Sequence, residues 1–328
     1  MAVNLSRPGM ELGAGADDAL IIEQYGGEVE GTFGKKSFMR QYVQIKSIRG
    51  TNMVTNDRIG KATLTTVTPG VRPEASVVQF DNISVKVDTI VLARNNTVLI
   101  DDFTSHYTVR MELGVEHGKE IAKFFDESFI IQAIKCARIV KGDGTLGTTK
   151  LPDGWFGGTV VPLTTAGDES DPVKLQAALE LACQKIEEND VDLDGGVIIC
   201  NVAAYYTLLK NDKLTNSQFS LGNGDYAEGQ VLKSNGLPVV KTNRIPKAAI
   251  VGHKLSNAGN ANAYDVSAAE AKAVAIVMLP KALLSGELIP LTSKVHYSDI
   301  ELQWFIDSYL SYAVTPNRAE HCAVVMKA

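Results

Sequence analysis

The sequence predicts an α+β fold, in which strands and helices form separate segments instead of alternating regularly. Three observations support this prediction. Residues 109–139 contain no proline and carry apolar side chains at the three-and-four spacing of one helix face. Residues 38–47 and 77–92 show the two-residue alternation that is typical of strands. Residues 171–210 predict a helix, a strand and a second helix, in that order.

Length, charge and composition exclude several classes of protein. The 328 residues suffice for two or three domains or for one elongated chain. The formal net charge is −6 and no run of basic residues occurs, which argues against a protein that holds nucleic acid by neutralising phosphates, although not against one that encloses it. No apolar stretch approaches the roughly 20 residues of a membrane helix, and we expect neither a membrane segment nor a secretion signal.

The four cysteines are far apart in the sequence, and none belongs to a CxxC motif or to a cluster with histidine. They are Cys136, Cys183, Cys200 and Cys322. Scattered cysteines of this kind are typical of buried thiols in a reducing compartment, and that is the state we expect.

The N-terminal residues predict an arm and not an independent domain. Residues 1–20 hold few core-forming side chains and several glycines. Asp17 and Asp18 can cap a short helix over residues 19–25, which a double glycine ends. Because so short a helix buries little by itself, it must lie against its own chain or against a neighbour.

A two-stranded excursion is expected between residues 51 and 87. A strand over residues 38–47 precedes it, and strands return over residues 77–92. Turns are predicted at Pro69-Gly70 and Arg72-Pro73, and the tip carries a weak core signal. An isolated two-stranded ribbon is marginally stable in water, so one that persists usually rests on a partner surface.

The long helix over residues 109–139 is the longest element expected. At a rise of 1.5 Å per residue it would measure about 45 Å. Its charged residues are expected to occupy the solvent-facing sides; they are Arg110, Glu112, Glu116, Lys119, Glu120, Lys123, Asp126 and Glu127. His117 falls on the apolar face and is expected to be a packed structural histidine. The helix should end near Lys141-Gly142, with basic residues in its last turn.

The C-terminal half predicts a second region of mixed structure. A helix should begin at Asp171-Pro172, with proline at its first position. Further elements are expected as a strand over 197–200, a helix over 202–210 capped by Asn201, and strands over 273–279, 295–299, 301–312 and 322–326. A short strand over 159–163 and a Gly-Leu-Pro-Val-Val segment at 236–240 complete the pattern.

Catalytic and cofactor motifs are absent from the sequence. It contains no GxSxG, GxxxxGK[ST] or HExxH motif and no GxGxxG that opens a helix. The five histidines stand apart from one another, and the carboxylate pairs Asp101-Asp102 and Asp192/Asp194 favour turn and cap roles over cation binding. We therefore expect no catalytic residues, no cofactor and no metal.

Four segments carry a resemblance to a known family. They are Tyr25-Gly26-Gly27-Glu28-Val29 with Phe33, residues 85–100 followed by Asp101-Asp102 and the long helix, Asn235 to Val240 with Thr242, Asn243 and Pro246, and Tyr312 to Glu320. In this order they resemble the major capsid proteins of tailed double-stranded DNA phages, and most of all those of autographivirus-like podoviruses. Residues 145–170 align with nothing, and Ala319-Glu320 stands where Pro-Glu is more usual.

The resemblance implies the tailed-phage major capsid fold and its four parts. These are an N-terminal arm over residues 1–50, an extended loop over 51–87, a peripheral domain with a long spine helix over 88–165 and 295–328, and an axial domain over 166–294. It also implies a structural protein and not an enzyme. Its copies would form pentamers and hexamers, first in a procapsid that then matures, and close into an icosahedral shell around the genome.

The resemblance also implies partners and a location. The partners would be further copies of the chain, a scaffolding protein, a portal protein and, as an option, a decoration protein. Double-stranded DNA would be enclosed without sequence-specific binding, and no membrane is involved. The protein would be located in the virion, after assembly in the host cytoplasm.

The candidate functional residues are therefore intersubunit contacts in the arm and the extended loop. They are Tyr25, Phe33, Arg58, Lys61 and Arg72. Two alternatives stay open at this point. An encapsulin-like compartment would share the fold and enclose a protein cargo, whereas an α/β enzyme would hold a pocket of perturbed titratable groups. The long arm with its Tyr-Gly-Gly-Glu-Val segment favours the phage shell.

Overall fold

The computed structural model describes most of the chain. The described residues are 28–59, 64–70, 72, 78, 80–98, 108–139, 156–211, 214, 224–225, 230–231 and 233–328. The short helix expected over residues 19–25 and the candidate contacts Tyr25 and Lys61 lie outside them.

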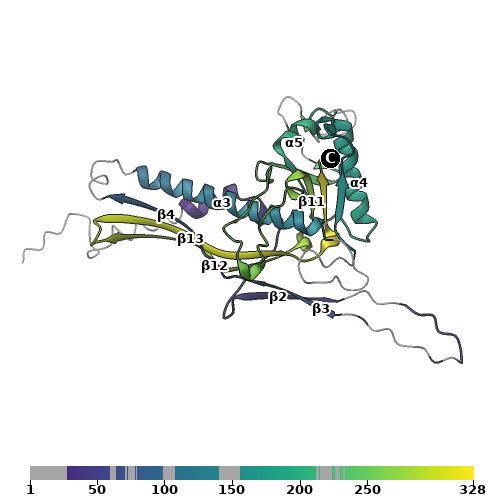
Figure 1. Ribbon diagram of the computed structural model, residues 1–328, viewed down its shortest axis with the longest axis horizontal. Coiled ribbons are helices and arrows are strands. Elements are labelled where there is room, and N and C mark those ends of the chain that lie inside the picture. Colours follow the sequence, from purple (N-terminus) through teal and green to yellow (C-terminus); the bar gives the residue numbers. More distant parts are fainter. Residues whose placement is uncertain are drawn as a thin grey trace, which may run out of the picture. The chain divides into compact units, whose positions relative to one another are not determined.

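The described residues combine helices and strands, which confirms the α+β class (Figure 1). The helices are residues 28–36, α3 (Thr108–Ala137), α4 (Pro172–Glu187) and α5 (Val202–Leu208), with short 3-10 turns η1 (Met39–Gln41), η2 (Asp168–Ser170), η3 (Ala258–Asn260), η4 (Glu270–Lys272), η5 (Pro280–Ala282) and η6 (Ala319–His321). The strands are β1 (Ile45–Ser47), β2 (Met53–Ile59), β3 (Phe80–Lys86), β4 (Val91–Val98), β5 (Thr159–Pro162), β6 (Val197–Asn201), β7 (Gly224–Asp225), β8 (Gln230–Val231), β9 (Lys233–Ser234), β10 (Leu237–Thr242), β11 (Ala273–Met278), β12 (Leu283–Ser298), β13 (Gln303–Pro316) and β14 (Cys322–Met326).

The long helix α3 is confirmed, but it ends at Ala137 and not near Lys141. Its last turn tightens, because the backbone N–H of Arg138 and that of Ile139 each donate to the carbonyl three residues earlier, at 3.1 and 3.2 Å. The carbonyl of Ile139 then accepts from Gly158 at 2.7 Å. This bond takes the place of a further helical turn.

Two expectations about strands were wrong. Residues 38–47 were expected to form one strand, yet only Ile45–Ser47 does. The backbone N–H groups of Tyr42 and Val43 both donate to the carbonyl of Met39 at 3.1 Å, so a turn replaces the ladder there. In contrast, β12 is much longer than the strand expected over 295–299. Pro290 inside it concealed the strand, because proline is rare in a strand interior.

The described chain separates into two compact units. The first comprises Met1–Phe38, Ile90–Phe125 and Ile289–Ser311, and the second comprises Met39–Thr89, Asp126–Leu288 and Tyr312–Ala328. Because their residue ranges cross these boundaries, α3, β12 and β13 each contribute to both units.

The second unit contains a six-stranded sheet of order β5-β14-β11-β6-β10-β9. Strand β11 runs antiparallel to both β14 and β6, whereas β10 is parallel to β6. All six residues of β11 are buried, as expected of a central strand covered on both faces. Helices α4 and α5 pack against this sheet and against each other (Figure 1).

Helix α4 is held at its start by the predicted cap. The Asp171 carboxylate accepts from the backbone N–H groups of Val173 and Lys174 at 2.9 and 3.3 Å, and Pro172 occupies the first helical position. The apolar face of the helix is then buried along its whole length: Leu175, Ala178, Leu179, Ala182 and Ile186. Asn201 also occupies the expected N-cap position of α5, but its side chain makes no capping bond.

In the first unit, residues 28–36 form a helix that packs on α3. Phe33 meets Phe125 edge-on, with ring centroids 5.5 Å apart. Gly118 allows the close approach, because a Cβ there would lie 2.9 Å from both the carbonyl oxygen of Val29 and the Cβ of Thr32. Glycine is unfavourable in a helix interior, so this contact explains its presence in α3.

Strand β4 pairs with β13 in the same unit, from Gln303 opposite Val98 to Leu310 opposite Val91. Arg94 lies opposite Asp307 and holds it with two hydrogen bonds of 2.6 Å, from Nε and Nη2. This bidentate geometry is the strongest form of the pair. Asp307 is buried, so the pair fixes the register of an edge strand.

The four cysteines are free and buried, as predicted. Burial raises the pKa of the Cys200 thiol to about 12, so it stays protonated at neutral pH. None of the helices that the structure describes is both long enough and apolar enough to span a membrane.

The contact at Gly118 gives a first prediction. Alanine at this position should lower the free energy of unfolding by about 1–3 kcal/mol, because the steric clash exceeds the gain in helix propensity. Gly34, in the helix over residues 28–36, has open space around its Cβ direction and serves as the control. Gly34→Ala should leave stability unchanged or raise it by up to about 1 kcal/mol. Urea denaturation of the unassembled chain measures both, and equal effects would contradict the packing argument.

Candidate functional site

The β2–β3 ribbon is the element that the sequence marks for function. Its strands pair antiparallel over seven residues each, from Met53 opposite Lys86 to Ile59 opposite Phe80 (Figure 1). The predicted two-stranded excursion is therefore confirmed. A ribbon of this kind has few partners of its own, so its stability depends on what it contacts at its base.

The base of the ribbon is anchored by a small hydrophobic cluster. Its members are Ile48, Val54, Ile83, Val87, Leu284 and Ala313, with Val85 and Leu288 packed alongside. Gly286 on β12 makes room for it, since a Cβ there would lie 2.6 Å from Val54 and 2.9 Å from Ile48. The ribbon thus packs directly on the backbone of β12, and a larger residue at position 286 would displace it.

Arg58 ties both strands of the ribbon to a distant part of the chain. Its guanidinium forms an ion pair with Asp81, the residue directly opposite on β3. Its Nη1 also donates to the carbonyl oxygen of Asn317 at 3.0 Å, and its side chain is only 3% exposed. Asn56, on the same strand as Arg58, donates from its side-chain amide to Asn317 Oδ1 at 3.1 Å. Two alternate residues of β2 are therefore bound to the segment that follows β13.

The outer end of the ribbon has the opposite character. Ile59 and Phe80 are directly opposite each other at the last paired position, with 55% and 76% of their surfaces exposed. Leu64 and Val67, just beyond β2, are exposed as well. Adjacent exposed apolar side chains on an extended element mark an interaction surface. We call Ile59 and Phe80 the tip pair.

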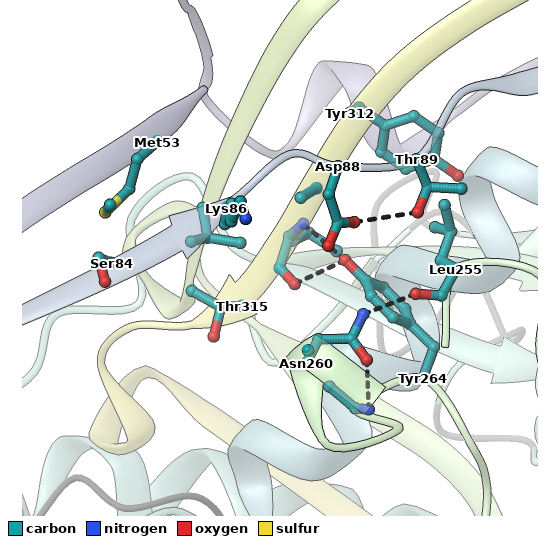
Figure 2. A pocket seen from close by; sticks show the side chains of 15 residues that line it. Met53, Ser84, Lys86, Asp88, Thr89, Leu255, Asn260, Tyr264, Tyr312 and Thr315 are labelled. Atoms are coloured by element: carbon teal, nitrogen blue, oxygen red, sulfur yellow. Dashed lines mark hydrogen bonds between the residues drawn. The ribbon is translucent and has the colours of Figure 1, made fainter. Parts of the chain in front are cut away.

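A cavity of about 370 Å³ lies beside the base of the ribbon (Figure 2). It is lined by the end of β3, by the loop over residues 255–264 and by residues 312–315. The Tyr264 hydroxyl donates to the Val314 carbonyl at 2.9 Å and accepts from its N–H at 2.8 Å, as Figure 2 shows. Burial raises the pKa of Tyr264, so the hydroxyl is a structural donor at neutral pH. Lys86 and Asp88 are the charged groups among the described lining residues.

The five candidate contacts have different positions. Phe33 is buried against α3, and Arg58 is buried against the Asn317 segment, one position before the outer end of the ribbon, so each has a role within its own chain. Arg72 is exposed. Tyr25 and Lys61 are not among the described residues, and an intersubunit role for any of the five stays a prediction. The tip pair was not among the predicted contacts, although two-residue alternation outward from Val54 and Ile83 places Ile59 and Phe80 away from the buried cluster.

Asp126 is a further residue that the sequence pattern misplaced. It was expected on the solvent-facing side of α3, yet it is fully buried. It forms an ion pair with Arg244 and accepts from the backbone N–H of Met39 at 3.3 Å. Burial lowers the pKa of Arg244, and the pairing offsets the cost of burying both charges. The sequence did indicate that Asp126 is buried, because Phe129 and Ile130, three and four residues later, lie on the same face of the helix.

Histidine and carboxylate side chains in the described part of the chain form no metal-binding cluster. No group of three or more His, Cys, Asp or Glu side chains lies close enough there to hold a metal ion. His117 and His253 are buried and have lowered pKa values because of desolvation. His253 stacks on Tyr264 with centroids 5.6 Å apart, which is a packing role. His117 is the packed histidine that its position on α3 predicted.

Comparison with protein families gives a match over most of the chain. The model described as "Gp10A-like: Major capsid protein" matches residues 74–310. This range contains β3 of the ribbon, α3, the six-stranded sheet except β14, and nearly all of the β12–β13 pair. A comparison with curated proteins found no match.

Solved structures show the same fold. The capsid chain of bacteriophage PhiM1 is 25% identical, with a TM-score of 0.73, over 89% of this chain and 87% of that one. The capsid of the cyanophage P-SCSP1u is 20% identical, with a TM-score of 0.75, over 89% and 88%. A virus-like particle from Pyrococcus furiosus is 12% identical, with a TM-score of 0.54, over 93% and 98%.

The Arg58 network gives a second prediction. Arg58→Ala leaves the Asn317 carbonyl and the Asp81 carboxylate without their charged donor, and should lower the free energy of unfolding by about 1.5–3 kcal/mol. Amide hydrogen exchange in β2 and β3 should speed up more than in α4. Lys119→Ala, which removes an exposed ion pair with Glu116 on α3, is the control and should change stability by less than about 1 kcal/mol. Equal losses of stability in Arg58→Ala and Lys119→Ala would contradict the role of Arg58 in holding the ribbon.

His321 gives a prediction about pH. Desolvation, with smaller contributions from Arg318 and Lys281, lowers the pKa of His321 to about 4. Above its unfolded value of about 6.5, His321 is neutral in both states and adds no pH dependence. As the pH falls from 6.5 towards 4, the unfolded chain binds the proton first and stability declines.

His321→Gln should reduce this decline by at most about 1.4 kcal/mol per pH unit. Urea denaturation of the wild type and of His321→Gln between pH 7.5 and pH 4 measures the free energy of unfolding of each. Subtracting the two curves removes the contribution of carboxylates that titrate in both proteins. Parallel curves for the two proteins would contradict the burial of a neutral imidazole.

Proposed function

The chain belongs to the Gp10A-like family of major capsid proteins, and on that premise we propose that it closes into an icosahedral phage head as pentamers and hexamers. The chain is a shell-forming structural protein and not an enzyme, it associates with copies of itself, and its place is the viral capsid. The observation that carries the finer proposal is the β2–β3 ribbon, which is braced at its base and apolar at its tip.

The ribbon is the part of the chain that needs a neighbour. The ribbon is held within one chain by the hydrophobic cluster at its base and by Arg58 one position before the tip pair. Ile59 and Phe80 keep 55% and 76% of their surfaces exposed, and burying two large apolar side chains contributes about 1.5–3 kcal/mol each. A neighbouring copy that covers the tip pair would join two subunits, and repetition around a closed ring would multiply that gain. Arg72 and Lys61 follow in the same loop and would border the same contact.

The four parts of the capsid fold are assigned on the same basis. We assign the arm to residues 1–50, the extended loop to 51–87, the peripheral domain to 88–165 and 295–328, and the axial domain to 166–294. Two observations support the assignment: the ribbon occupies the proposed loop, and the six-stranded sheet lies largely in the proposed axial domain. The buried Phe33 indicates that the part of the arm after residue 28 docks on its own chain.

Assembly would involve further partners. We propose a scaffolding protein, a portal protein and, as an option, a decoration protein, with assembly in the host cytoplasm before maturation of the procapsid. The shell would enclose double-stranded DNA without sequence-specific binding. The net charge of −6 supports this, because a lining that is not strongly basic lets DNA move during packaging.

An encapsulin-like compartment is the second candidate. The Pyrococcus furiosus particle has the same fold, but its 12% identity carries no further argument about function. The family match favours the phage shell. Purified particles separate the two, because a compartment would contain a protein cargo and a phage head would contain a genome.

The tip pair gives the test of this proposal. The double variant Ile59→Ser with Phe80→Ser should fold with unchanged stability, because both side chains are exposed, yet fail to form closed shells. Ile83→Ser, in the buried base cluster, is the matched control and should lower the free energy of unfolding by about 2–4 kcal/mol. Urea denaturation and electron microscopy of the expressed particles measure the two properties. Normal shells from the double variant would contradict the role of the tip.

A further inference from the structure

One end of the six-stranded sheet gathers lysine side chains. Strands β6 and β10 run in parallel and both end there, whereas β11 begins there and β14 ends there. This topology brings together Lys247 after β10, Lys272 before β11 and Lys327 after β14. Figure 1 shows the C end of the chain and α5 at this end of the sheet.

A groove of about 1030 Å³ lies between these lysines. The three lysines and Asn201 and Asn243 line it, and most of the remaining lining is alanine. Small side chains leave the floor open to the backbone of another chain, while the lysines supply positive charge at its edges. We call this surface the basic groove.

The lysines of the basic groove have weak partners in their own chain. Lys327 lies 3.4 Å from a Glu169 carboxylate oxygen, and both side chains are partly exposed. Lys272 donates to the carbonyl oxygen of Ala328 at 3.1 Å, and Lys247 donates to Asn243 Oδ1 at 2.7 Å. Lys272 and Lys247 thus bind a backbone oxygen and an amide oxygen and not a side-chain carboxylate, which leaves their charge available to a second copy.

The opposite end of the same sheet is acidic. The last residue of α4 and the segment that joins this helix to β6 carry five exposed carboxylates within eight residues: Glu187, Glu188, Asp190, Asp192 and Asp194. No basic side chain of the described residues lies within ion-pair distance of them. Lys185 in the last turn of α4 is the nearest cation in sequence. A position in a turn can explain a single acidic residue here. It does not explain five like charges so close in sequence, because these repel one another. We call residues 187–194 the acidic turn.

The two surfaces cannot meet within one chain. The acidic turn precedes β6 and the basic groove follows it, so the five residues of the strand separate them by about 16 Å at 3.3 Å per residue. Opposite charges at opposite ends of one unit fit head-to-tail contacts, which close into rings when the rotation allows. We propose that the basic groove of one copy receives the acidic turn of a second copy within a capsomer ring. This inference rests on the proposed function and adds the surfaces through which neighbours recognise each other.

A charge exchange in the full-length chain tests the contact. The groove variant carries Lys247→Glu with Lys272→Glu, the turn variant carries Asp192→Lys with Asp194→Lys, and a third protein carries all four changes. Lys35→Glu with Lys46→Glu, at exposed positions elsewhere, is the control with the same change in net charge as the groove variant. Sedimentation measures the concentration at which half of each protein is assembled, and thermal melting of the unassembled chains verifies folding.

The groove and turn variants should each raise this concentration by about tenfold or more, since like charges then face each other around the ring. The fourfold variant should return to within about threefold of the wild type, as should the control. The inference would be overturned if the fourfold variant assembled even less readily than the groove and turn variants. It would also be overturned if the control raised the half-assembly concentration as much as they do. If the wild-type chain assembles but the fourfold variant does not recover assembly, this inference is wrong and the proposed function stays intact. A wild-type chain that never assembles overturns both.

A cross-linking experiment covers the case in which the reversed variants do not fold. Lys272→Cys and Asp194→Cys chains are mixed, assembled and oxidised with diamide, which takes up the two electrons and two protons released as the disulfide forms. The four native thiols are buried and should not react. Disulfide-linked dimers that need both variants support the contact. Assembled particles without such dimers would overturn it.

Discussion

The buried Arg58 guanidinium is the interaction on which the functional part of this structure depends. A two-stranded ribbon gains little from its own ladder, so something outside it must fix its direction. Arg58 does this by binding Asp81 across the ribbon and the Asn317 carbonyl beyond it. The hydrophobic cluster, packed against the backbone at Gly286, holds the base of the ribbon on the same face, since Val54 and Arg58 are alternate residues of β2. The ribbon can therefore present an apolar tip without losing its position.

Buried charges recur where segments distant in sequence meet. Asp126 on α3 holds both Arg244 after β10 and the backbone of Met39, and Arg94 holds Asp307 between β4 and β13. Such pairs contribute little net stability, but breaking one is costly because it leaves a charge without a partner. They therefore fix how these segments align with one another. A fixed alignment suits a protein whose copies must present the same surfaces to many neighbours.

The sequence predicted most of the elements because their signals are local. Residues 109–139 carry a helical period without proline, and Asp171-Pro172 marks the start of α4, so both helices were found. The order of four motifs identified the family, which the match over residues 74–310 supports. The failures arose from tertiary contacts. Residues 38–47 alternate like a strand, yet Met39 is buried and its carbonyl accepts from a turn.

The candidate site was harder to predict than the fold. Phe33 and Arg58 were predicted as contacts between subunits because they lie in the arm and in the extended loop, but the folded chain buries both. Alternation along β2 and β3 places the tip pair on the face opposite the buried cluster, but the sequence does not show whether that face meets another part of the chain. The basic groove was invisible for another reason, since Lys247, Lys272 and Lys327 meet only through the sheet topology.

The central claim is that this chain is completed by its neighbours in a closed shell, with the ribbon as the joining element. Cryo-electron microscopy of particles formed by the full-length chain tests it most directly. The account predicts an icosahedral shell in which Ile59 and Phe80 of each copy are covered by an adjacent subunit, while Arg58 still binds Asn317 of its own chain. Compact monomers or small open oligomers, or a shell in which the tip pair faces solvent, would contradict it.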